Sequence, residues 1–150
     1  MSANVENDIL VLLSDAARQM RTYADQVAQA HGLTRAQWII LKRLEQQPDL
    51  SQNELAALAE VTPMTVARLV DRLETLGLLK RCTDPADRRI WRLQLTPQAA
   101  PVLRALNVER VRLHKVITKG IDPSVLNAMA IGLRQMKENV STRRHAEAAA

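Results

Sequence analysis

The sequence predicts a mainly α-helical protein that contains one small β-hairpin. Apolar residues recur at spacings of three and four along most of the 150-residue chain, which is the period of an amphipathic helix. Four glycines and six prolines are few for an all-β protein. The helical period is lost around residues 79–95, where apolar and polar side chains alternate in two short runs.

Three helices are expected before residue 62. The first covers 5–31 and is ended by Gly32. Its apolar stripe is Ile9, Leu13, Ala16, Ala17, Met20, Tyr23, Ala24 and Val27. Thr34 and Gln37 resemble a capping box, which opens a second helix. The face that this helix buries is Trp38, Leu41 and Leu44. A second capping box, from Ser51 to Glu54, opens a short helix over 52–60. Its apolar residues are Leu55, Ala56, Leu58 and Ala59.

A fourth helix is expected over 63–76. Thr62 is a good N-cap, and Pro63 occupies the first helical position, where its missing N–H costs nothing. Gly77 stands where a C-terminal cap belongs. The stripe that would face the core is Val66, Leu69, Val70, Leu73 and Leu76.

The alternating runs over 79–83 and 90–95 predict two strands of a hairpin, joined by a charged, turn-rich loop over 84–89. Thr96 and Pro97 repeat the N-cap and proline signal and open a helix over about 97–119. Gly120 ends that helix, and Asp122 followed by Pro123 opens a last helix to about residue 144.

Two short helices with a brief break between them, followed by a two-stranded hairpin, form a winged helix-turn-helix. We therefore assign 33–96 to a winged helix-turn-helix DNA-binding module, and 1–32 plus 97–150 to a helical dimerisation region. The outer helices are longer than the module needs for its own core. Since two-fold dimers are the commonest oligomers, a second copy of the chain is the expected cover for their apolar stripes.

Composition excludes several classes of protein. No run of 18 apolar residues exists, and the acidic N-terminal segment is unlike a signal peptide, so we expect a cytoplasmic protein. With one cysteine and no metal-ligand spacing among its histidines, the chain offers no internal disulfide and no metal site. No phosphate loop or nucleophile elbow occurs, so we expect neither a cofactor nor an enzyme. Three aromatic residues are too few for a base-stacking platform.

The helix over 63–76 carries the first candidate site. With its apolar stripe turned inward, the opposite face presents Met64, Thr65, Arg68 and Arg72, next to the cap Thr62. The N-terminal part of a second helix-turn-helix helix meets base edges in the major groove. There Arg68 can bond both acceptors of a guanine, and Thr65 can bond a base or touch a thymine methyl. The alternative is that both arginines are solvated helix charges.

The hairpin loop is the second candidate. Arg88 and Arg89 are adjacent, so one can enter a minor groove while the other meets phosphate. Asp87 would hold one of them in bidentate geometry before DNA binds. A plain solvated turn is the alternative. Between residues 62 and 96, seven basic and four acidic side chains give a net +3 of the chain's +5. Neutral donors for the DNA backbone are expected at Ser51, Gln52 and Asn53.

These residues resemble the multiple antibiotic resistance regulator (MarR) family, in particular its SlyA-like branch. The most specific piece is a helix ending VARLVDRLETLGLLKR followed by the hairpin DPADRRIWRLQLT. The resemblance is strong over about residues 33–99. It implies a homodimeric repressor or activator that binds a pseudo-palindromic DNA site and responds to small aromatic, anionic ligands. Arg68 falls on the base-reading arginine, and Asp87, Arg88 and Arg89 fall on the wing motif. The family's glycine after the hairpin is absent here.

The same resemblance implies an effector site between the first helix and the module. The matching positions are Arg18, Arg21, Trp38 and Lys42, with Tyr23 and His31 on the same two helices. Cations there would pair with a carboxylate while the indole stacks on an aromatic ring. A free aromatic carboxylate or its coenzyme A thioester would suit this chemistry. Alternatively, Trp38 belongs to the core and the arginines form a solvated face or an intersubunit salt bridge.

Two further alternatives remain open at this stage. Some relatives sense peroxide through a cysteine near the start of the first helix, but the lone Cys82 lies in a predicted strand and is expected to be a small core residue. A winged helix also serves some proteins as a protein–protein adaptor. Such an adaptor would bind DNA weakly and without preference for any sequence.

Overall fold

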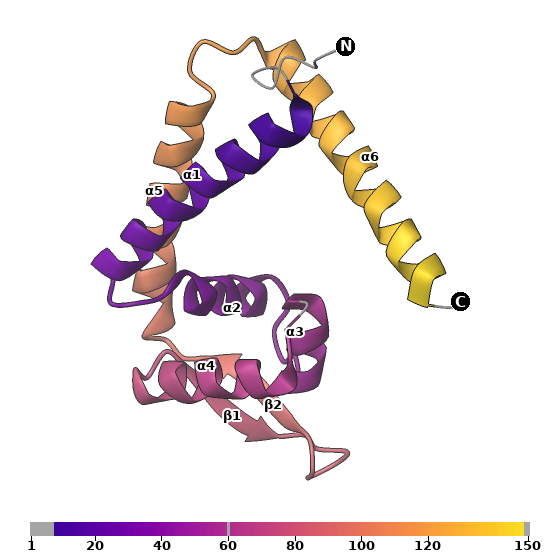
Figure 1. Cartoon of the computed structure of the whole chain (residues 1–150). Coiled ribbons are helices and arrows are strands. Elements are labelled where there is room, and N and C mark those ends of the chain that lie inside the picture. Colours follow the sequence, from indigo (N-terminus) through magenta and orange to yellow (C-terminus); the bar gives the residue numbers. More distant parts are fainter. Residues whose placement is uncertain (1–7, 60, 149–150) are drawn as a thin grey trace. The chain divides into compact units, whose positions relative to one another are not determined.

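The computed structural model describes residues 8–59 and 61–148, with side chains as far as residue 143. Figure 1 shows the predicted class, helices with one two-stranded antiparallel hairpin. The helices are α1 (Ile9–Ala30), α2 (Arg35–Gln46), α3 (Gln52–Ala59), α4 (Pro63–Thr75), α5 (Ala99–Ile117) and α6 (Pro123–Ala148). The strands are β1 (Leu79–Thr83) and β2 (Trp91–Leu95). The expected helical residues 5–7 lie outside the described part of the chain.

Side-chain caps set the starts of the first four helices. Asp8 accepts a hydrogen bond from the backbone of Leu10 at 2.8 Å and begins α1. The predicted capping box at α2 is present in both directions. The box at α3 is present as well, because Ser51 Oγ accepts from the Glu54 backbone and Glu54 Oε2 accepts from the Ser51 backbone. Thr62 caps α4 with Pro63 in its first turn.

The N-cap predicted at Thr96 is wrong. Its hydroxyl donates to the carbonyl of Gly77 instead, and α5 begins at Ala99. Gly77 has a φ of +71°, a left-handed conformation that favours glycine and ends α4 as expected. The hydroxyl of Thr96 therefore joins the end of the hairpin to the end of α4. At the other end of the chain, α6 runs beyond the expected residue 144, to Ala148.

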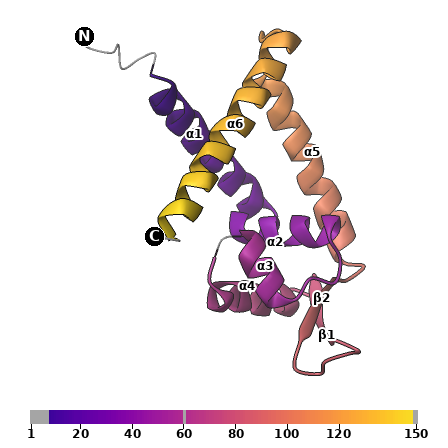
Figure 2. The same ribbon diagram turned by 90° about the vertical axis from the view of Figure 1, so that its right-hand side faces the viewer.

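The hairpin is attached to the loop before α3. Within it, Leu79 faces Leu95 and Thr83 faces Trp91 in antiparallel register. On the outer edge of β2, the backbone N–H of Leu93 donates to the Leu50 carbonyl at 2.9 Å, and Ser51 forms a bridge with Arg92. Figure 2 shows the hairpin extending beyond α3 and α4.

One apolar core lies among α2, α3, α4 and the hairpin. Its fully buried members include Leu41, Leu55, Val66, Leu73 and Leu93. It reaches beyond the module assigned over 33–96. From outside that range it also takes in Ala28, Ala99, Leu103 and Leu106. The chain accordingly divides into a compact unit of residues 1–109 and a second unit of residues 110–150, with the division inside α5 instead of before it.

Several residues expected in a core are not buried in the single chain. In α1 only Ala28, which is not in the predicted stripe, is fully buried, whereas Ile9, Leu13 and Met20 are exposed. Leu58 and Leu76 are also exposed, because α3 and α4 turn these positions away from the core. The expected core position of Cys82 is wrong. Its side chain is only half-buried, and its Sγ lies 3.3 Å from Gln94 Oε1.

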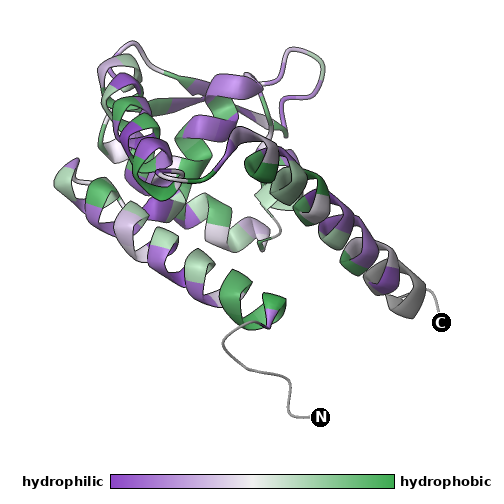
Figure 3. Ribbon diagram, turned by 90° about the horizontal axis from the view of Figure 1, so that it is seen from above, coloured by the Kyte–Doolittle hydropathy of each residue, from purple (hydrophilic) through white to green (hydrophobic). Residues whose placement is uncertain are grey.

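Exposed apolar side chains are concentrated on α1, α5 and α6. On α5 they are Val108, Val111, Val116 and Ile117. The N-terminal turns of α1, green in Figure 3, expose Ile9, Leu10, Val11, Leu12 and Leu13. In the second unit, α6 exposes Val125, Met129, Ile131, Leu133, Met136 and Val140. None of the described helices combines the length and hydrophobicity needed to cross a membrane.

Candidate nucleic-acid interface

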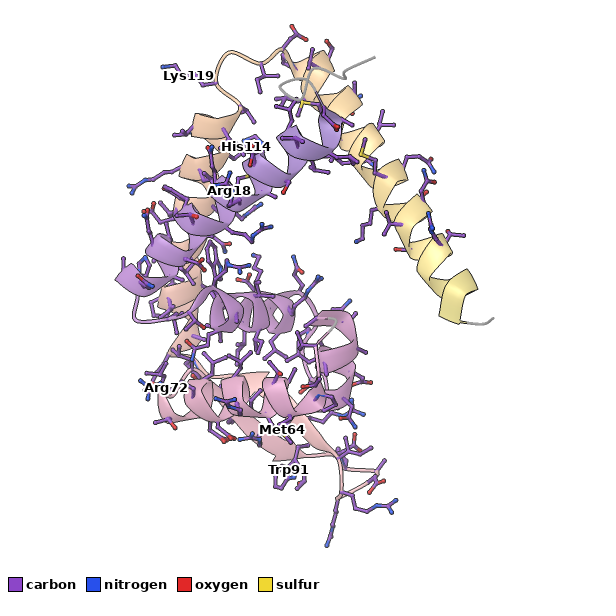
Figure 4. All side chains as sticks on the ribbon, viewed as in Figure 1. Arg18, Met64, Arg72, Trp91, His114 and Lys119 are labelled. Carbon is purple, nitrogen blue, oxygen red and sulfur yellow. The ribbon has the colours of Figure 1, made fainter. Side chains whose placement is uncertain are left out.

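The outer face of α4 is exposed, as the sequence predicts. Met64 is 76% exposed, and Thr65, Arg68 and Arg72 are also on the surface, while Val66 on the opposite face is fully buried. Arg68 and Arg72 form no hydrogen bond or ion pair with any described residue. Met64 and Arg72 are labelled near the two ends of the helix in Figure 4. The two guanidinium groups are thus available to an external partner.

The cap at the start of α4 uses part of its hydrogen-bonding capacity. Thr62 Oγ1 accepts from the Thr65 backbone at 3.2 Å, and the two threonine hydroxyls lie 2.9 Å apart. Both residues are exposed. A hydroxyl can donate one bond and accept two, so each retains capacity for a further partner.

The tip of the hairpin contains the bidentate ion pair expected at Asp87. Arg89 Nε donates to Asp87 Oδ1 at 3.1 Å, and Arg89 Nη2 donates to Oδ2 at 3.0 Å. This hydrogen bond from Arg89 holds the pKa of Asp87 below its ordinary value. The Arg89 side chain nevertheless remains 89% exposed. Arg88 beside it is exposed and has no partner among the described residues.

Asp84 organises the start of the loop, a role that the sequence analysis did not assign to it. Its Oδ1 accepts from the backbones of Ala86 and Asp87, at 2.7 and 3.1 Å. Its Oδ2 accepts from Arg92 Nε at 2.6 Å, and this bond is the main cause of the lowered pKa of Asp84. Aspartate before proline at the start of a charged loop is the signal of such a turn.

Two arginines of the hairpin turn inward. Arg81 donates to Asp71 and Glu74 of α4 and to Gln52 of α3, and its side chain is 19% exposed. Arg92 donates to Asp84 and also to Glu54 of α3, at 2.8 Å. We call these two arginines and their partners the seam, since they join the hairpin to both helices.

The three expected backbone donors differ in exposure. Ser51 is buried and its hydroxyl caps α3, so its side chain does not project as the sequence suggests. Gln52 is half-buried and accepts from Arg81 at 2.8 Å, whereas Asn53 is exposed. The structure nonetheless brings all three to one depression of about 250 Å³, which we call the notch. Its lining is Ser51, Gln52, Asn53, Arg89, Ile90 and Trp91.

The six residues expected around an effector do not converge on one site. Tyr23 and His31 line a cavity of about 310 Å³ together with Gln26, Val27 and Ala30 of the same helix region and Glu109 of α5. Arg18, Arg21, Trp38 and Lys42 do not line this cavity. Glu109 was missed, because its sequence neighbourhood gives no sign that α5 returns to α1.

The four residues outside the cavity have other environments. Arg18 pairs with Asp15 on the same helix, and Arg21 is exposed. Lys42 donates to Glu45 at 2.6 Å and to Asn107 at 3.0 Å. Trp38 is half-buried against the core, as the alternative interpretation held. No cluster of three or more His, Cys, Asp or Glu among the described residues is arranged to hold a metal ion.

Comparison with known proteins gives a consistent result. A sequence model of the MarR family matches residues 31–90, which hold α2 to α4 and the first strand of the hairpin. The structure of the transcriptional regulator SlyA matches with a TM-score of 0.80 and 28% identity, covering 91% of this chain and 96% of that one.

Two other solved structures match in fold. The S. aureus MepR–DNA complex has a TM-score of 0.79 at 24% identity, covering 92% of this chain and 99% of that one. Bordetella bronchiseptica BpsR, described as regulated in its DNA binding by 6-hydroxynicotinic acid, has a TM-score of 0.78 at 24% identity, covering 91% and 98%. The helix-turn-helix thus matches the MarR family in sequence, and the whole chain resembles the winged helix transcription regulator SlyA in fold.

Proposed function

We propose that the chain binds duplex DNA at specific sequences, with α4 in the major groove and the hairpin as a wing in the adjacent minor groove. The observation that carries this proposal is the outer face of α4, where two arginines stand exposed without partners beside Met64 and Thr65. Arg68 is placed to read a guanine, and Arg72 lies one turn farther along the helix. Arg88 and Arg89 at the tip supply the wing contacts. The MepR structure, a complex with DNA, supports this mode of binding.

We further propose that the chain works as a homodimer on a pseudo-palindromic site. The exposed apolar residues at the start of α1, and separately those along α6, are of the kind that an obligate partner covers. Two copies of α4 would then enter successive major grooves, with half-site centres about 10 bp apart. In the cytoplasm such a dimer would act as a repressor by occupying its site.

A small aromatic effector would release the DNA. The cavity at Tyr23 and His31 is the site that supports this best, since a phenol ring offers stacking and an imidazole offers a hydrogen bond to a carboxylate. The regulation of BpsR by an aromatic acid and the likeness to SlyA support the SlyA-like assignment. Release requires that the ligand bind better to a dimer whose two α4 helices no longer fit one face of the duplex.

The test begins with selection of bound fragments from a random duplex pool. Regulator function predicts one enriched motif with two-fold pseudo-symmetry, and affinity that falls steeply as salt rises. Weak binding with no enriched motif would favour the protein–protein adaptor instead. Arg68→Ala and Lys119→Ala each remove one positive charge, but Lys119 lies outside the proposed interface. A larger loss of affinity in Arg68→Ala would therefore reflect base reading and not a general loss of charge.

Homodimer formation and effector response need separate measurements. Sedimentation of the full chain at micromolar concentration should give twice the chain mass of 16.8 kDa. A Leu133→Glu and Met136→Glu double variant should sediment as a single chain. Titration of the DNA complex with hydroxylated aromatic acids and their coenzyme A thioesters should release DNA, and Tyr23→Ala should weaken this release. A single chain that binds its palindrome with full affinity would contradict the dimer.

A further inference from the structure

Trp91 lies where the hairpin extends past the core. Side chains two residues apart share a face of a strand, so Trp91 continues the face on which Leu93 is fully buried. One step farther toward the tip that face is only partly covered, and Trp91 is 48% exposed. Figure 4 labels it on the hairpin. Its indole N–H has no hydrogen-bond acceptor among the described residues.

The surroundings of Trp91 combine apolar surface with hydrogen-bond donors. Ile90, also exposed, stands beside it, and both line the notch with Asn53 and Arg89. Gln52 and Asn53 begin α3, whose first-turn N–H groups have no acceptors within the helix; that of Glu54 is capped by Ser51 Oγ. The chain has only two tryptophans and one tyrosine, so few of its side chains could pack a flat aromatic ring against a partner, and Trp91 exposes one of them.

We propose that the notch seats one sugar–phosphate unit of the DNA backbone, with the Trp91 indole packed against deoxyribose. This inference rests on the proposed DNA binding and adds a contact to it. A deoxyribose presents apolar C–H groups next to an anionic phosphate, and the notch presents an apolar wall next to amide and guanidinium donors. The indole N–H, which can only donate, suits a phosphate oxygen. Trp91 is thus a positioning residue that sets where the backbone lies relative to α4 and the tip.

The salt dependence of DNA affinity distinguishes this contact from an arginine contact. The indole carries no charge, so its removal releases no additional counterion. Trp91→Ala should weaken binding about tenfold on the selected operator and on an unrelated duplex alike, since deoxyribose is common to both. The slope of log affinity against log salt should stay unchanged. Arg88→Ala, the matched control on the same hairpin, should reduce that slope by about one.

Tryptophan emission gives a second readout that does not depend on a destabilised variant. In Trp38→Phe the indole of Trp91 is the only one left, and its emission should change on saturation with duplex DNA. In Trp91→Phe the remaining Trp38, half-buried against the core, should report no change. The phenyl ring of Trp91→Phe should also restore part of the affinity that Trp91→Ala loses.

The measurements distinguish failure of the proposed DNA binding from failure of the Trp91 contact. A wild-type chain that binds no duplex overturns both the proposed function and this inference. A wild-type chain that binds, with Trp91→Ala equal to it in affinity or with unchanged Trp91 emission in the complex, overturns this inference alone. A loss confined to one DNA sequence would place Trp91 against a base and would equally overturn the backbone contact.

Discussion

The six arginines between residues 62 and 96 divide into two regions with opposite surroundings. On the surface, Arg68, Arg72 and Arg88 have no partner among the described residues, and Arg89 is almost fully exposed. At the seam, Arg81 and Arg92 are held by carboxylates of α3, α4 and the loop. The net charge of the segment is therefore not spread evenly. At the seam the positive charges are balanced by carboxylates, whereas on the outer face of α4 they are available to a polyanion. Location decides which arginines are available to an external partner and which stabilise the fold.

The largest effect should come from the surface region. Arg68→Ala should cost roughly 1–3 kcal/mol of binding free energy and relax sequence choice at one base position, because a bidentate contact to guanine is lost. The free energy of unfolding should stay the same, since Arg68 has no partner to leave behind. Anisotropy titrations and a repeated selection measure both binding quantities. An unchanged affinity and an unchanged motif would remove Arg68 from the reading role.

The seam should respond in the opposite way. Arg81→Ala should lower the free energy of unfolding by about 1–2 kcal/mol, a value reduced from that of buried pairs because Asp71 and Glu74 stay partly solvated. Urea unfolding followed by circular dichroism measures this. Arg81→Lys keeps the charge, but an ammonium group lacks the planar arrangement of donors by which the guanidinium reaches three partners. This variant should therefore recover only part of the loss. Full stability in Arg81→Ala would show that the seam contributes nothing.

Arg89 shares a property with each of the two regions, since it is exposed like the surface arginines and paired with a carboxylate, Asp87, like those of the seam. Arg89→Ala should weaken binding most on operators with A·T-rich flanks, where the narrow minor groove concentrates negative potential. Asp87→Asn keeps the arginine but loosens its orientation, so it should weaken the same flanks to a smaller extent. Equal losses on G·C-rich flanks would count against insertion into the minor groove.

The smallest expected effect is the acid response of the seam. Asp84 has a pKa below the usual 3.8 because it accepts from Arg92 and from two backbone N–H groups, so its charge stabilises the folded chain. This contribution is complete above about pH 5 and is lost as the pH falls through the lowered pKa of the folded state. The difference in stability between the wild type and Asp84→Asn should therefore shrink toward pH 2. A difference that does not vary with pH would contradict this assignment.

Local signals predicted the elements of the fold well. The caps at Thr34, Ser51 and Thr62 and the glycine at 77 act within a few residues, so the sequence displays both partners. Thr96 misled the prediction because its hydroxyl finds a distant partner, the carbonyl of Gly77. The apolar stripe of α1 could be read from its period, but its exposure at Ile9, Leu13 and Met20 could not.

The candidate site was predictable on α4 and less so elsewhere. A helical period and a proline at the first turn suffice to place Arg68 outward. Whether Arg92 faces solvent or Glu54 depends on pairing across 38 residues, which no local pattern encodes. Glu109 joins Tyr23 and His31 for the same reason, through the return of α5 toward α1. The exposure of Trp91 could be predicted only by knowing where the core ends.

The attachment of β2 to the loop before α3 bears on how an effector would act. The Leu93–Leu50 hydrogen bond ties the wing to the same backbone that leads into α3, and Gln94 donates to Asp49 at 2.6 Å beside it. These bonds hold the hairpin and the start of α3 together as one block. A bound effector would therefore not be expected to change a single contact within that block. In the proposed homodimer an effector would instead change the orientation of one copy relative to the other, so release from all the grooves should be concerted.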